Sequence, residues 1–160
     1  MSEPLREQVL VALVAKLESM TGLRLWGGAY PNPPKVHRKF KLPSEITQFP
    51  QLCVFEGSID GSGSSVRIEV TVGGQVGIRH EYKVLLAGYV RGDGAVLAST
   101  WRERLWSDCL KTLMAENTLD GLVMKIDWVP EMETDGEELD PVALFVQPLS
   151  ITFHETFTTD

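Results

Sequence analysis

The chain has 160 residues, 43% of them hydrophobic and 23% charged, which is typical of one soluble globular domain and excludes a disordered or fibrous protein. Fifteen Lys and Arg against 22 Asp and Glu give a net charge of −7, which disfavours general binding to nucleic-acid phosphates. No apolar run reaches the ~20 residues of a membrane helix, and the N-terminus lacks the apolar segment of a signal peptide. We therefore expect a single domain over residues 1–160, made in a cytoplasm, with no membrane contact.

The first predicted element is an N-terminal helix that is capped by Ser2, has Pro4 in its first turn and ends at Gly22. Its apolar residues recur every three or four positions and form one stripe, which consists of Leu5, Val9, Leu10, Leu13, Leu17 and Met20. Val11 and Val14 lie off this stripe. They are either ordinary helix-surface valines or contacts with another subunit.

After this helix we expect a short strand over Leu23 to Trp26 and then an irregular segment, because prolines 31, 33 and 34 can occupy neither a helix interior nor a central strand. The next residues, 35–43, hold the only basic cluster of the chain, which consists of Lys35, Arg38, Lys39 and Lys41. This cluster is either a solvated loop or a docking surface for an acidic partner.

A buried strand is predicted over Leu52 to Phe55, whose continuous apolar run is typical of a strand that is covered on both faces. Cys53 lies in this strand and Cys109 on the apolar side of a later helix, so both are expected to be buried free thiols. The glycine-rich residues 56–65 are interpreted as a flexible linker.

The linker leads to a long β-hairpin over Val66 to Arg91, which we interpret as the element around which the chain is built. Apolar and polar residues alternate strictly in its first arm, Val66 to Val72. In its second arm one face is expected to carry His80, Tyr82, Val84, Leu86 and Val90, and the other Arg79, Glu81 and Lys83. Gly73-Gly74-Gln75 supplies the turn between the arms. A hairpin alone cannot exclude water from its apolar face, so we expect other elements to cover that face.

A second helix is predicted over Val96 to Glu116, capped either by Asp93 or by the capping box of Thr100 and Glu103. Its apolar face follows i+4 spacing and is formed by Leu97, Trp101, Leu105, Cys109 and Leu113, with Trp106, Leu110 and Met114 beside them. This pattern is typical of a helix that lies across a sheet. Trp101 and Leu105 are therefore expected to be buried against the hairpin.

The remaining residues predict two strands separated by an acidic segment. Met124, Ile126 and Trp128 alternate with polar residues as one strand. The acidic segment has six carboxylates in ten residues, at Glu131, Glu133, Asp135, Glu137, Glu138 and Asp140, and we expect it to stay solvated unless a cationic partner docks there. The last strand places the apolar side chains of Leu149, Ile151, Phe153 and Phe157 on one face.

Together these elements predict an α+β fold, in which a mixed, mainly antiparallel β-sheet carries the N-terminal helix and the second long helix on one face. No catalytic, cofactor-binding or metal site is predicted. The glycines do not connect a strand to a helix N-terminus as in phosphate-binding loops, and His37, His80 and His154 lack zinc-ligand spacing. The acidic segment lacks the ligand spacing of an EF-hand, although weak calcium binding stays open.

The order of the elements resembles the tail-terminator proteins of long-tailed bacteriophages and the related tail-completion proteins of the neck. The features that carry the resemblance span most of the chain and are the helix 3–20, the Pro-rich basic loop 31–43, the strand 51–57, the hairpin arm 66–72, the helix 96–116 and the strand 149–157. The resemblance implies a late structural protein of the virion, assembled in the host cytoplasm as a hexameric ring. Such a ring caps the tail tube at its final length and joins it to the head connector, so the expected partners are further copies of the chain, the tail-tube protein and neck proteins.

Two other hypotheses remain open. One is another neck, head-completion or minor tail protein. The other is a small cytosolic enzyme or ligand-binding domain with a site near Trp26, Tyr30 and His37. No sequence-specific contact with nucleic acid is expected in any of these roles.

A ring repeats one heterologous contact, so it needs complementary patches at different places on each subunit. We expect the basic cluster of one subunit to meet the acidic segment of the next, chiefly at Glu131, Glu133, Glu137 and Glu138, with Val11 and Val14 as further contact residues. A contact between the two segments within one subunit is the alternative.

Overall fold

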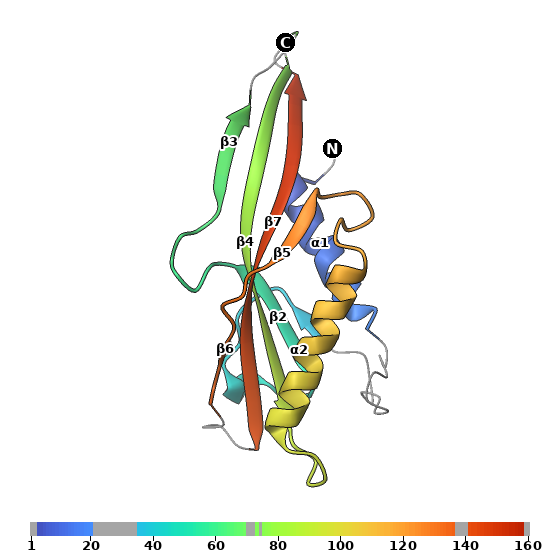
Figure 1. Ribbon diagram of the computed structural model, residues 1–160, viewed down its shortest axis with the longest axis vertical. Helices are drawn as coiled ribbons and strands as arrows, with labels where there is room; N and C mark the ends of the chain where they lie inside the picture. The colour runs from blue at the N-terminus through green and yellow to red at the C-terminus, as the bar shows by residue number, and fades with distance from the viewer. Residues whose placement is uncertain (1–2, 21–34, 70–72, 74, 137–140, 159–160) are drawn as a thin grey trace.

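The computed structural model describes residues 3–20, 35–69, 73, 75–136 and 141–158, and this part of the chain has the α+β fold that the sequence predicts. Two helices pack on a mixed, mostly antiparallel sheet of seven strands (Figure 1). In chain order the elements are α1 (Leu5–Glu18), β1 (Lys35–His37), the 3-10 helix η1 (Pro43–Glu45), β2 (Gln51–Glu56), β3 (Ser65–Glu69), β4 (Gln75–Arg91), α2 (Ala98–Ala115), β5 (Lys125–Trp128), β6 (Glu133–Thr134) and β7 (Val142–Thr158).

The sheet is built on the pair of long strands β4 and β7. Each has 17 residues, and they pair antiparallel along their whole length, from Gln75 opposite Thr158 to Arg91 opposite Val142. The ribbon twists, so that β4 lies to the left of β7 at the top of Figure 1 and to its right at the bottom. The hairpin of β3 and β4 forms as predicted, with Gly73 at a φ of 67° in its turn, but it is not the centre of the fold, because β3 is a short edge strand.

The shorter strands extend both edges of this ribbon. The edge of β4 that faces away from β7 pairs with β3 at residues 77–81 and with β2 at residues 84–89. Strand β1 then pairs parallel with β2. On the other side, β5 and β6 both pair with β7. The sheet therefore ends at β1 and β3 on one side and at β5 and β6 on the opposite side.

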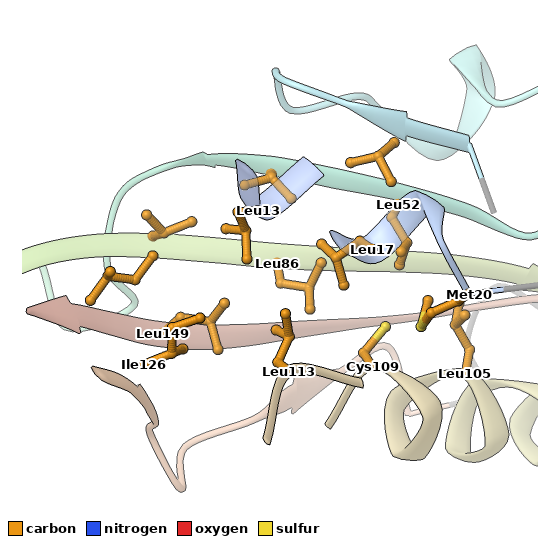
Figure 2. Close-up of a cluster of buried hydrophobic side chains, with 14 of the residues drawn as sticks. Leu13, Leu17, Met20, Leu52, Leu86, Leu105, Cys109, Leu113, Ile126 and Leu149 are labelled. Atoms are coloured by element: carbon orange, nitrogen blue, oxygen red, sulfur yellow. The ribbon is translucent and has the colours of Figure 1, made fainter. Parts of the chain in front are cut away.

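The main hydrophobic core lies between one face of the sheet and the two helices. Leu13 and Leu17 of α1 and Leu105 of α2 are fully buried against strand residues such as Leu86 of β4, as Figure 2 shows. The predicted stripe of α1 is confirmed at its buried members Val9, Leu13, Leu17 and Met20, with Leu5 and Leu10 at the margin of the core. On α2 the prediction is confirmed for Leu105, Cys109 and Leu113, whereas Trp101 is half-buried at the margin of the core.

A second, smaller core lies on the opposite face of the sheet. Cys53 of β2 and Tyr89 of β4 are buried there, together with Ile46 from the segment between β1 and β2. The Tyr89 hydroxyl donates a hydrogen bond to the backbone carbonyl of Lys41, which ties this segment to the sheet. Strand β2 is thus covered on both faces, as its continuous apolar run predicts. Cys53 and Cys109 are buried free thiols, and burial raises the pKa of both.

Neither helix begins with the predicted cap. Pro4 occupies the N-cap position of α1 and no side chain caps it; Ser2 and Gly22 lie outside the described residues. The N-cap position of α2 is Leu97, which is 71% exposed. The Asp93 carboxylate instead accepts hydrogen bonds from the N–H groups of Ala95 (3.0 Å) and Val96 (2.7 Å) in the turn before the helix, so it shapes the approach of the chain to α2.

Candidate assembly surfaces

One end of the β4–β7 ribbon projects beyond both helices (Figure 1). We call this end the arm; it consists of β3 and of residues 75–81 of β4 and 152–158 of β7. A 17-residue strand is about 56 Å long, whereas the 18 residues of α2 span only about 27 Å. Neither helix alone is long enough to cover the whole ribbon, and Figure 1 shows that both end short of the arm.

The arm has an uncovered apolar face. Val66 is 52% exposed, Ile68 74% and Phe157 44%. Ile68 lies opposite Ile78, and Val76 opposite Phe157, so these side chains share the face that the helices cover further along the sheet. The expectation that other elements cover this face is wrong for Val66 and Ile68, while Val70 and Val72 lie outside the described residues. Strand alternation shows that an apolar face exists but not whether another element reaches it.

At the base of the arm the main core ends in contacts between aromatic rings and charged or polar groups. The His80 ring stacks on Phe153 with 4.5 Å between the ring centres, and His80 Nε2 lies 3.1 Å from Glu155 Oε1. Arg6 of α1 places its guanidinium 4.9 Å from the centre of the Tyr82 ring. Sequence alternation placed His80 and Tyr82 on the inner face, but it carried no signal for these partners. The core therefore ends at this level, and the arm continues past it.

The other face of the arm is charged. Arg67 of β3 lies directly opposite Arg79 of β4, and no carboxylate among the described residues forms an ion pair with either. Glu69 lies two positions from Arg67, with its carboxylate 3.5 Å from His154 Nδ1. Like charges opposite each other on neighbouring strands are unfavourable. The arm thus carries two closely placed guanidinium groups without a described counter-ion.

The predicted basic loop is partly a strand. Lys35 is exposed at the start of β1, and Lys39 is exposed in the segment that follows. Arg38, however, forms a two-pronged ion pair with Glu7 of α1, in which Nη2 lies 2.7 Å from Oε2. His37 is half-buried, and its pKa is lowered by this burial and by the nearby Lys41. Lys35 and Lys39 are therefore better placed than Arg38 to bind a partner.

The acidic segment is also partly ordered into the sheet. Glu131 and Glu133 are exposed, and Glu133 belongs to β6, while Glu137, Glu138 and Asp140 lie outside the described residues. The expectation of a wholly solvated segment is wrong for Asp135, whose side chain is 4% exposed. Its Oδ1 lies 3.1 Å from Nη1 of Arg102 on α2 and accepts a hydrogen bond from the N–H of Leu144. Sequence patterns missed this pair because its members are 33 residues apart.

The basic and acidic clusters lie at opposite edges of the sheet. Strand β1 is the last strand on the side of β2, and β6 is an edge strand on the side of β7. Among the described residues no ion pair joins Lys35, Lys39 or Lys41 to Glu131 or Glu133. The described part of the chain therefore gives no support to a contact between these clusters within one subunit.

The remaining candidate residues divide between exposed and partly buried positions. Val11 is 53% exposed on the outer surface of α1, whereas Val14 is partly buried against the main core. Val11 can therefore contact another molecule, and Val14 contributes mainly to the fold. Trp26 and Tyr30 lie outside the described residues.

A cavity of about 290 Å³ lies at the end of the sheet opposite the arm. Phe49, Pro50, Val90 and Trp101 form most of its lining, with Arg91 and Asp93 at its polar side. The Asp93 carboxylate is already engaged by two backbone N–H groups, and the volume is at the lower limit of small-molecule sites. Within the described ranges no group of three or more His, Cys, Asp or Glu side chains is placed to share a metal ion, and neither helix could span a membrane.

Comparison with known proteins adds no assignment to this geometry. The sequence matches no protein-family model, and no curated protein is significantly similar to it. We therefore infer the function from the surfaces of the molecule itself.

Proposed function

We propose that this protein is a structural subunit that assembles head to tail into a ring, and that the ring caps a phage tail tube and joins it to the head connector. The tail-terminator role comes from the resemblance in the order of elements. The observation that carries the assembly is the opposite charge of the two sheet edges. Lys35 in β1 and Lys39 just after it lie at one edge, and Glu133 in β6 and Glu131 just before it lie at the other.

This arrangement has the property that a closed ring requires. A heterologous contact joins two different patches, so each subunit offers one patch to each neighbour. Two patches at opposite edges of one sheet can be used at the same time without competing for space. Their opposite charges favour the head-to-tail contact and disfavour contact between two like edges.

The test is assembly of the purified protein, followed by sedimentation velocity and negative-stain electron microscopy at low and high salt. We expect rings at low salt that dissociate as salt increases, because exposed ion pairs are screened over about 8–10 Å at 0.1–0.15 M ionic strength. Lys35→Glu with Lys39→Glu should abolish the rings. Adding Glu131→Lys and Glu133→Lys to that variant should restore them in part.

Lys111→Glu is the control, because Lys111 is an exposed lysine of α2 and belongs to neither the basic cluster nor the acidic segment. It should leave ring formation unchanged. Arg38→Glu is unsuitable, since it would also break the ion pair with Glu7 inside the subunit. A protein that stays monomeric at all concentrations, or rings that form normally in the Lys35→Glu/Lys39→Glu variant, would contradict the proposal.

The tail-terminator role needs a second experiment. The purified protein is mixed with preformed tubes of a tail-tube protein, and electron microscopy then shows whether it binds at tube ends or along their sides. The proposal expects density at one end of each tube and an arrest of further tube growth. If rings form but do not bind to tubes, the proposed assembly stands and the terminator role is wrong.

A further inference from the structure

Strand β3 is an open edge of the arm. It pairs with β4 on one side, and none of the described residues pairs with its other side. Its side chains are almost all exposed, including the two apolar residues Val66 and Ile68. An exposed edge with apolar side chains is a template for another strand. Figure 1 shows β3 at the outside of the arm, away from both helices, where a second molecule can approach it.

The charges of β3 select one register for a second copy of the same strand. In a two-fold antiparallel pair the residue on the axis faces itself, and directly opposite residues share a face. An axis at Arg67 would place two arginines together, and an axis at Glu69 would place two carboxylates together. An axis at Ile68 instead places Arg67 of each copy opposite Glu69 of the other and brings the two Ile68 side chains into contact.

This register also improves the charge balance of the arm. Arg67 faces Arg79 within the subunit, and Glu69 has only His154 within ion-pair distance among the described residues. The symmetric pair supplies each Arg67 with a carboxylate from the other copy. It forms two such ion pairs for each dimer, while Ile68, the most exposed of the large apolar residues described, becomes covered.

We propose that β3 binds β3 of a second copy in an antiparallel, two-fold pair centred on Ile68, so that one sheet continues through the arms of two subunits. The contact is independent of the proposed ring, because it uses neither β1 nor β6. A five-residue strand buries less than the roughly 1,600 Å² of a standard interface. The pairing is therefore weak and concentration-dependent.

Cysteine cross-linking tests the register directly. Opposite residues of antiparallel strands have Cα atoms about 4.5–5.5 Å apart, which suits a disulfide. Ile68→Cys should therefore form a disulfide-linked dimer when a mild thiol oxidant such as diamide is added. In this register Val66 of one copy lies four positions from Val66 of the other, about 13 Å along the strand, so Val66→Cys is the matched control.

We expect Ile68→Cys to cross-link at least about tenfold faster than Val66→Cys, measured as the dimer fraction on non-reducing gels. The wild-type chain should give no dimer, because Cys53 and Cys109 are buried. Equal rates for the two variants, or no dimer from either at high protein concentration, would overturn the proposal.

A charge exchange in the Ile68→Cys protein sharpens the test. Arg67→Glu replaces both attractive pairs by repulsive ones and should slow cross-linking about tenfold, given the strength of cross-strand charge pairs. Adding Glu69→Arg restores opposite charges and should restore the rate, while Lys39→Glu should not change it. Circular dichroism confirms that each variant is folded. A rate unaffected by Arg67→Glu, or not recovered in the double exchange, would overturn this register.

Discussion

Strand β4 passes through two regions that differ in how its apolar side chains are used. In the helix-covered half, Tyr82, Val84 and Leu86 are buried under α1 and α2. In the arm the same alternation continues through Val76 and Ile78, but the neighbouring Ile68 on β3 is largely exposed. An alternating strand thus has one apolar face that another element must bury, and the described part of the chain buries it over only about half of the ribbon. We infer that the other half is available to a second molecule.

The largest expected effect is in the helix-covered half. Leu105 is fully buried between α2 and the sheet, so Leu105→Ala removes packed methyl groups and leaves a cavity. We expect a loss of about 2–5 kcal/mol in the free energy of unfolding, measured by chemical denaturation. Lys111→Ala on the exposed side of the same helix is the control. Similar values for the two variants would show that α2 does not pack as described.

A slightly smaller effect is expected where α2 holds the acidic segment. The Arg102 side chain is 11% exposed and that of Asp135 is 4% exposed, so Arg102→Leu leaves a buried carboxylate without its cation. We expect a loss of about 3 kcal/mol. Asp135→Asn in the Arg102→Leu background removes the buried charge and should recover part of the loss. If the double variant is less stable than Arg102→Leu, the ion pair is not the reason for the loss.

The end of α2 should show a pH dependence. The Glu116 carboxylate accepts hydrogen bonds from the Thr118 hydroxyl and from the N–H groups of Asp120 and Thr118, which lower its pKa from 4.5 to about 2. Because the pKa of Glu116 is lower in the folded state, these hydrogen bonds stabilise the fold fully above pH 4.5. This stabilisation is lost as the pH falls from 4.5 towards 2. Glu116→Gln should therefore lose less stability than the wild type between these pH values. If the free energy of unfolding falls equally with pH in both proteins, Glu116 is not the group responsible.

The smallest effect on stability is expected in the arm. Ile68 is 74% exposed, so Ile68→Ser should change the free energy of unfolding of the dilute protein by no more than about 0.5 kcal/mol. The same variant should associate less at high concentration, measured by sedimentation velocity. A loss comparable to that of Leu105→Ala would mean that Ile68 is covered within the single subunit and would remove the contrast between the two regions.

The fold could be predicted where a local pattern decides the structure. The spacing of Leu13 and Leu17 predicts the buried stripe of α1, and the apolar run around Cys53 predicts a strand covered on both faces. Local patterns do not show which residues of one element are covered by another element. The exposure of Ile68 depends on where the helices end in space, and the pairing of β4 with β7 joins segments far apart in the chain.

The candidate surfaces could be predicted only in outline. The charge runs identify the basic and acidic segments, but tertiary contacts decide which of their members remain available. Arg38 forms an ion pair with Glu7, and Asp135 forms one with Arg102, and the members of these pairs are 31 and 33 residues apart in the chain. The sequence does not predict the open edge of β3, because its alternation predicts a hairpin whose apolar face is covered.

Hydrogen exchange at two protein concentrations tests whether β3 is a contact surface between copies and contributes little to the stability of one subunit. In the dilute protein, amides of β3 should exchange much faster than those of Val84 and Leu86 in the covered half of β4. At high concentration, exchange over residues 65–69 should slow, while exchange in the covered half stays the same. Amides of β3 that are as strongly protected in the dilute protein as those of the covered half, with no change on concentration, would contradict the account.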